Sequence, residues 1–316
     1  MSAPILTLEN LSHRFGDHCV LHDLNLSILA GQIVALVGPS GCGKSTLLRA
    51  IVGTHPPTTG RVCIAHGAES RVVDKPSRDC GIVYQRYSLF PHLTAQENVA
   101  YGLMVDETKI HTRLLKPRYW KSLRKTHLAK AAEMLDKMKL GSALDKYPPE
   151  MSGGMCQRVA IAQALIMKPS ILLLDEPFGA LDEATREELQ RILLTLYAEN
   201  QEAIRKDQTP PHTVIIVTHE INEAIFVSDR ILGLSQYWDW AGAGLSQHPG
   251  ATIVYDKPAP IFAPDDPRDF LSFRQQKDEI LKSVFNPDYL QAHGEYIELS
   301  HQIAKNAAQL KTQQVP

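Results

Sequence analysis

The sequence has little that would mark a membrane-spanning, secreted or nucleic-acid-binding protein. It contains no run of about eighteen apolar residues, the length that a membrane-spanning helix needs. No basic segment followed by an apolar stretch comes after Met1, so we expect no secretory signal. The net charge of −2 differs from the basic charge of most nucleic-acid-binding domains, so no nucleic-acid partner is expected.

Cysteine is scarce, and no internal repeat or low-complexity tract occurs. The five cysteines are odd in number and lack C-x-x-C spacing, which argues against a zinc site or a disulfide framework and fits a reducing cytosol. The chain has 316 residues, of which 44% are apolar and 22% charged, as in an ordinary globular protein. This length allows one large domain, or one domain with an appendage.

One glycine-rich segment fits the phosphate-loop pattern G-x-x-x-x-G-K-[ST]. An apolar stretch over 32–37, which predicts a buried strand, precedes it, and a predicted helix over 46–52 follows. Gly53 can close that helix in the left-handed conformation. The segment consists of Gly38, Pro39, Ser40, Gly41, Cys42, Gly43, Lys44, Ser45 and Thr46.

The chemistry of this segment predicts nucleotide binding. Glycines let the backbone wrap a phosphate with its N–H groups pointing inward, and a helix N-terminus adds a positive dipole end. Lys44 would contact the β- and γ-phosphates, and the Ser45 hydroxyl would bind Mg²⁺. Cys42 lies near the helix N-terminus, so we expect a lowered thiol pKa. The alternative is a glycine-rich turn that carries a lysine by chance.

Apolar runs separated by helical patterns predict an α/β fold. Residues 81–84, 171–174 and 213–218 are apolar on both faces, which is typical of parallel strands covered on both sides. Residues 23–28 alternate between apolar and polar and predict a half-buried strand. Helices are expected over 128–140 and after Gly154 through Met167.

Two acids, Asp175 and Glu176, end the apolar run Leu172–Leu174. Side chains at the carboxyl ends of parallel strands point into the crevice where α/β proteins bind ligands. Asp175 could hold Mg²⁺ through water, and Glu176 could orient or deprotonate an attacking water. The alternative is that these acids cap a following helix.

Four further segments follow the phosphate loop. They are Gln85 after an apolar strand, Met151-Ser152-Gly153-Gly154-Met155, residues 179–182 and Thr218-His219-Glu220. With these motifs in this order, the chain resembles the ATP-binding-cassette (ABC) ATPases over about residues 5–260. In that family they resemble the start of the glutamine loop, the signature L-S-G-G-Q with methionine in place of leucine and of glutamine, the D-loop and the loop of the switch histidine.

This resemblance implies roles for single residues. Ser152, Gly153 and Gly154 would face the γ-phosphate of ATP held by a second copy of the chain. His219 would contact the γ-phosphate, and Gln85 would reach Mg²⁺ or the attacking water. Phe15 matches the aromatic that stacks on adenine. The alternatives are a histidine that caps a helix and an aromatic residue of the core.

The resemblance also implies the fold, cofactors and partners. We expect a mainly parallel core sheet, an antiparallel β subdomain, a helical signature subdomain and a C-terminal extension. The ATPase domain would span 1–260, with a basic insert at about 106–127, and the helical extension 261–316. ATP and Mg²⁺ would be the cofactors. The partners would be a second copy, membrane permease subunits and a substrate-binding protein, at the cytoplasmic face of the inner membrane.

The branch of the family is predicted from a few residues. Met155 and the segments 87–99 and 159–165 resemble bacterial importers, above all the nitrate/sulfonate/taurine group; polyamine and betaine importers share much of this pattern. The alternatives are a soluble ATPase of translation or DNA repair, an exporter ATPase and a non-catalytic module. Since the transported molecule does not touch this subunit in such systems, the sequence says little about it.

Two segments lie outside these motifs. The basic insert 106–127 is either a solvated helical face or a contact with the membrane partner or anionic headgroups. In the tail, a helix is expected over 267–285, followed by a second one. Its apolar residues would pack on the core of the chain or contribute to dimer contact or regulation; these are Phe270, Phe273, Ile280 and Leu281.

Overall fold

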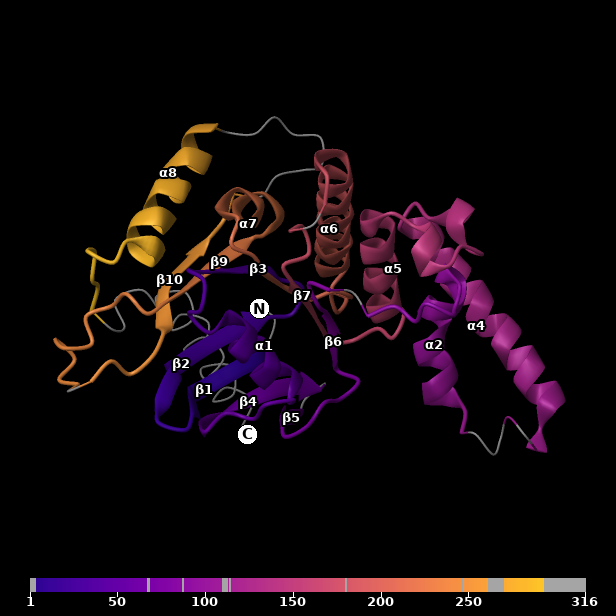
Figure 1. Ribbon diagram of the computed structural model, residues 1–316, viewed down its shortest axis with the longest axis horizontal. Helices are drawn as coiled ribbons and strands as arrows, with labels where there is room; N and C mark the ends of the chain where they lie inside the picture. The colour runs from indigo at the N-terminus through magenta and orange to yellow at the C-terminus, as the bar shows by residue number, and fades with distance from the viewer. Residues whose placement is uncertain are drawn as a thin grey trace.

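The computed structural model describes residues 4–66, 69–86, 88–109, 113, 115–179, 181–245, 247–260 and 270–292. They form two sheets with helices around them (Figure 1). The first sheet has the order β2-β1-β4-β5 and is antiparallel throughout. Its strands are β1 (Pro4–Phe15), β2 (His18–Leu29), β4 (Thr59–His66) and β5 (Glu69–Val72).

The second sheet has the order β10-β9-β3-β8-β7-β6 and is parallel except for the edge strand β10. Its central strands are apolar on both faces, as the sequence predicts. The strands are β3 (Ile33–Val37), β6 (Cys80–Val83), β7 (Ile171–Asp175), β8 (Val214–Val217), β9 (Arg230–Ser235) and β10 (Thr252–Pro258).

The helices cover this sheet in groups. In Figure 1, α2, α4 and α5 gather at one end of the molecule, and α8 lies at the other. The α-helices are α1 (Lys44–Val52), α2 (Ala95–Glu107), α4 (Pro117–Lys137), α5 (Gly153–Leu165), α6 (Glu183–Arg205), α7 (Ile221–Val227) and α8 (Phe270–Ile280). Shorter turns are η1 (Gly141–Ala143), η2 (Pro148–Glu150) and the π-helical η3 (Leu281–Phe285). No helix of the described part is long and apolar enough to cross a membrane.

Alternate residues of each central strand belong to different cores. On β7, Leu172 and Leu174 join the core with α2, α4, α5 and α6. Ile171 and Leu173 join the core formed by α1 and the antiparallel sheet. A third core packs α7, α8 and η3 on β3, β9 and β10. The parallel sheet is therefore covered on both sides, which confirms the predicted α/β class.

Two predicted helices have different bounds in the structure. The helix expected over 128–140 begins at Pro117 and ends at Lys137, because Lys139 has a left-handed φ of 56°. The apolar periodicity continues beyond it, since Leu140 is still buried. Gly153 and Gly154 are the first residues of α5 rather than its preceding loop, and α5 ends at Leu165, before Met167.

The tail packs on the core, as the first interpretation predicts. Ile280 and Val284 are fully buried in the third core, and Phe273 packs against it. Leu281 is exposed instead, because the helical turn carries it to the solvent side. The second helix predicted in the tail lies outside the described residues, which end at 292. The domain boundary at 260 stays a prediction, because residues 261–269 are not described either.

Candidate nucleotide-binding site

The loop between β3 and α1 has the backbone that phosphate binding needs. Gly41 and Gly43 have positive φ angles of 80° and 100°, and Gly43 directly precedes α1. A Cβ atom on Gly38 would lie 2.1 Å from the carbonyl oxygen of Leu234 on the adjacent strand β9. Glycine is therefore required at Gly38 by close packing and is favoured at the other two by conformation.

Lys44 directs its ammonium group into this loop. Its Nζ donates to the carbonyl oxygens of Gly38 at 2.7 Å and Pro39 at 3.0 Å, and the side chain is almost fully buried. Ser40 and Ser45 are exposed on the same segment, and Thr46 is half-buried. The loop thus combines a fixed positive charge with accessible hydroxyls.

Cys42 corrects one expectation. Its side chain is 2% exposed and packs in the core beneath the loop. Burial raises the pKa of this thiol, and the nearby charge of Lys44 opposes the effect only in part. The predicted lowering by the helix N-terminus is wrong, because the thiol points into an apolar region rather than toward solvent.

The acidic end of β7 lies near the loop, at the carboxyl edge of the parallel sheet. Strands β7, β8 and β3 are consecutive neighbours in this sheet, so their carboxyl ends meet at one edge. Burial and the charge of Glu176 raise the pKa of the Asp175 carboxyl, while Arg49 and Lys44 lower it. Asp175 therefore lies within electrostatic reach of the phosphate-loop lysine.

Glu176 and His219 are in direct contact. Oε2 of Glu176 lies 2.6 Å from Nδ1 of His219. Neither residue caps a helix: Asp182 caps α6 and Glu220 precedes α7, so both capping alternatives are wrong. The half-exposed imidazole and the mostly buried carboxylate form a polar pair beside Asp175.

Gln85 follows β6 and is exposed. Its Nε2 lies 4.0 Å from the position that a Cβ on Gly179 would occupy, next to the turn after Glu176. The segment behind it is fixed by Asn98, which the sequence did not single out. This fully buried amide accepts from the backbone N–H of Phe90 and donates to the carbonyl oxygens of Phe90 and Leu93.

The signature segment begins α5. The Ser152 hydroxyl accepts from the backbone N–H of Met155 at 3.3 Å and so caps the helix. Ser152 and Gly153 are exposed, whereas Gly154 is buried. A Cβ on Gly154 would lie 1.9 Å from Cγ2 of Thr185 in the first turn of α6. Gly154 thus has a packing role that the sequence did not predict.

Phe15 is not a core aromatic, because it is 49% exposed at the end of β1. Its ring meets those of His13 and His55 edge-on, with centroids 4.6 and 6.5 Å away. An aromatic ring held in this way at the surface is suited to stack on a flat ligand.

Comparison with known proteins agrees with this geometry. The family model described as "ABC transporter" matches residues 21–179. The sulfate/thiosulfate import ATP-binding protein CysA of Pectobacterium atrosepticum is 40% identical over 253 residues, which are 79% of this chain and 70% of that protein. The protein of the same name from Pseudomonas aeruginosa is 39% identical over 81% of this chain and 70% of its own.

Solved structures show the same fold. The dimeric bacterial ABC transporter cassette MJ0796 is similar with a TM-score of 0.59 and 29% identity, over 81% of this chain and 100% of its own. A post-hydrolysis dimer of MJ0796 bound to ADP and Pi gives a TM-score of 0.59 and 28% identity, with the same coverage. The chain therefore belongs to the ABC transporter family, as an ATPase with the ATP-binding-cassette fold.

Proposed function

We propose that this chain binds Mg·ATP at residues 38–46 and hydrolyses it with Glu176 and His219. The observation that carries this proposal is the 2.6 Å contact between these two side chains at the edge where Asp175 and Lys44 also lie. Glu176 follows β7, His219 follows β8, and Lys44 follows β3 through the glycine-rich loop, so three neighbouring strands of one sheet supply these groups. Such convergence is what phosphoryl transfer requires, since its catalysis is mostly positioning and charge stabilisation.

Each residue has a distinct task in this mechanism. The loop N–H groups and Lys44 would hold the phosphates, and exposed Phe15 would stack on the adenine. Glu176 would accept a proton from the attacking water. His219, oriented by its contact with Glu176, would donate a hydrogen bond to the γ-phosphate.

The residues present also fit a magnesium ion. The Ser45 hydroxyl, the Gln85 side-chain amide oxygen and the Asp175 carboxylate are hard oxygen donors, and Mg²⁺ binds few protein oxygens besides substrate phosphates and water. When bound, the ion would neutralise charge on the β- and γ-phosphates.

The second half of each site would come from a second copy of the chain. Ser152 and Gly153 are exposed at the N-terminus of α5, a place that favours anions. There they would meet the γ-phosphate of ATP bound by the partner. The similar cassette MJ0796 is dimeric, which supports this arrangement.

We further propose that two copies of the chain drive the import of a small oxyanion through a separate membrane permease. They would bind at the cytoplasmic face of the permease, and a substrate-binding protein would deliver the anion. The relatives are named for sulfate and thiosulfate import, so we favour these anions over the nitrate, sulfonate or taurine expected at first. Uptake of labelled sulfate, thiosulfate, nitrate and taurine in a strain that lacks this chain tests the choice. Loss of nitrate or taurine uptake alone would contradict it.

Glu176→Gln tests the chemistry, because glutamine keeps the shape and cannot take the proton. We expect the variant to bind ATP and to lose hydrolysis. Light scattering on the chain itself should show a dimer with Mg·ATP and a monomer with Mg·ADP. Exposed Glu187 on α6 provides the matched control, Glu187→Gln, which should hydrolyse ATP normally. An active Glu176→Gln enzyme would refute the assignment.

A further inference from the structure

The loop that carries His219 is fixed from behind by a buried carboxylate. The Thr218 hydroxyl accepts from the backbone N–H of Glu220 at 3.0 Å and donates to Oε2 of Glu223 at 3.2 Å. Thr218 is 2% and Glu223 8% exposed. Because Thr218 directly precedes His219, this hydroxyl fixes the backbone from which the imidazole projects.

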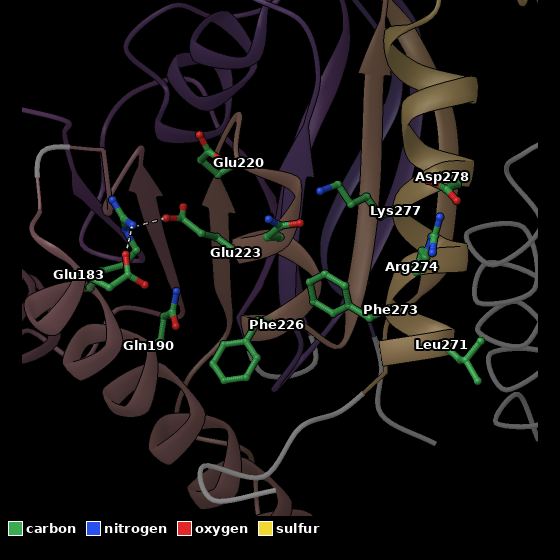
Figure 2. A pocket seen from close by; sticks show the side chains of 12 residues that line it. Glu183, Gln190, Glu220, Glu223, Phe226, Leu271, Phe273, Arg274, Lys277 and Asp278 are labelled. Carbon is green, nitrogen blue, oxygen red and sulfur yellow. Dashed lines mark hydrogen bonds and ion pairs between the residues drawn. The ribbon is translucent and has the colours of Figure 1, made fainter. Parts of the chain in front are cut away.

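The other carboxylate oxygen of Glu223 reaches α6. Oε1 lies 3.1 Å from Nε of Arg186, in the first turn of that helix. The same guanidinium donates to the carbonyl oxygen of Leu181 at 3.2 Å and to Glu183 at 2.7 Å. One arginine therefore connects the segment before α6 with the loop of His219; its partners Glu183 and Glu223 are the labelled ends of the dashed lines in Figure 2.

This pair borders a cavity of about 970 Å³ between α6, α7 and α8. Arg274, Lys277 and Asp278 of α8 line the opposite wall in Figure 2, and Phe226 and Phe273, lower in the view, also line the cavity. On the cavity side the pair is held by its 3.1 Å ion pair and by the hydrogen bonds that Glu223 accepts from Thr218 and that Arg186 donates to Leu181. Removal of the charge should loosen the contact without leaving a hole in a core.

We infer that Glu223 and Arg186 act as a positioning pair, which holds the His219 loop in register with the segment before α6. The inference rests on the proposed role of His219. Glu176, which contacts His219, lies six residues before Asp182, the cap of α6. A shift of either segment would change the contact between Glu176 and His219, and a misplacement of about 1 Å can cost roughly 100-fold in rate.

Burial raises the pKa of Glu223 to about 7, so the assay is run at pH 8, where the carboxylate is charged. Glu223→Gln keeps the shape and an acceptor for Thr218 but removes the ion pair. We expect kcat for ATP to fall roughly 10-fold or more, with KM changed less than about twofold. The urea midpoint should stay close to that of the wild-type chain. Because its pKa is raised to about 7, the charge of Glu223 adds little stability, and the part-exposed Arg186 keeps its ion pair with Glu183. Lys277→Gln, on the opposite wall of the same cavity, is the matched control and should keep the wild-type kcat.

Thr218 gives a second and independent test. Thr218→Val has the same shape without the hydroxyl and should lower kcat like Glu223→Gln, whereas Thr218→Ser should keep most of it. Because both changes act through one loop, the double variant Thr218→Val/Glu223→Gln should be no slower than the slower single variant.

The outcomes separate this inference from the proposed function. If the wild-type chain hydrolyses no ATP, or His219→Ala is fully active, the proposed function fails. If the wild type is active and Glu223→Gln equals it, the positioning pair is refuted. Additive losses in the double variant, or a lost kcat that follows a lowered urea midpoint, would reduce the pair to a general structural role and refute the inference as well.

Discussion

Gly154→Ala should separate the signature helix from α6. The added Cβ would lie 1.9 Å from Cγ2 of Thr185, a distance that atoms cannot adopt, so the two helix starts must move apart. Forcing a methyl group into a packed contact costs about 1–3 kcal/mol. Replacing a helical glycine with alanine stabilises the helix by up to about 1 kcal/mol. The difference is an expected net loss of up to about 2 kcal/mol in the free energy of unfolding.

Thr185→Ser is the compensating change. It removes Cγ2 but keeps the hydroxyl that donates to Asp182 at 2.8 Å, so the cap of α6 remains. The next nearest atoms to the new methyl group would be Cβ at 3.1 Å and Oγ1 at 3.2 Å, which a shift of a few tenths of an ångström relieves. Gly154→Ala/Thr185→Ser should recover most of the loss.

Urea unfolding of the wild type, both single variants and the double variant measures this cycle. Thr185→Ser alone should stay near the wild type. The reasoning fails if Gly154→Ala is as stable as the wild type, or if serine at 185 restores nothing. It also predicts that Gly154→Ala weakens ATP-dependent dimerisation, because Ser152 and Gly153 move with the start of α5.

Three further predictions concern stability and surface. Asp256→Asn should lower the free energy of unfolding by about 3–5 kcal/mol in urea titrations, because it breaks a buried ion pair with Arg230 at 2.7 and 2.8 Å. Burial raises the pKa of Asp229 to about 7, so the stability that its protonated form contributes is full below about pH 4 and is lost as pH rises toward 7. Between pH 5.5 and 7.5, the free energy of unfolding of Asp229→Asn should therefore fall less than that of the wild type. In the basic insert, four exposed cations of α4 and its cap should attract anionic vesicles; they are Lys116, Arg118, Lys121 and Lys125. Their replacement by glutamine should reduce the amount of chain that sediments with such vesicles, while ATP hydrolysis stays within a few-fold. Unchanged sedimentation would favour the interpretation of a solvated helical face.

The central strands and the phosphate loop were predictable because their causes are local in sequence. Ile171–Leu174 is apolar at every position because its two faces enter two different cores, and such a short run between turn signals is typical of a covered parallel strand. In the loop, Gly41 and Gly43 satisfy a conformational demand that few other residues meet. Such constraints can be recognised without knowledge of distant contacts.

For residues 117–127, the N-terminal half of α4, the sequence offered a solvated helical face as only one of two interpretations. Residues 117–127 carry lysine, arginine and tyrosine with few apolar positions, so no periodicity marks them as helical. The end of the helix was misplaced for the opposite reason: Leu140 keeps the apolar spacing although Lys139 has already left the helical conformation.

Long-range contacts explain the remaining differences at the site. Arg186 and Glu223 lie on different helices, and neither belongs to a motif that we recognised in the sequence, so only the fold brings them to 3.1 Å. For Cys42, helix-terminus electrostatics gave the wrong direction of the pKa shift, because the side chain enters the core beneath the loop. A long-range contact also explains Gly154. Its place in the signature suggests contact with phosphate, yet the absence of a Cβ is what lets α5 approach Thr185. A glycine in a binding motif can therefore be required by helix packing as much as by the ligand, and the cycle with Thr185→Ser distinguishes these two demands.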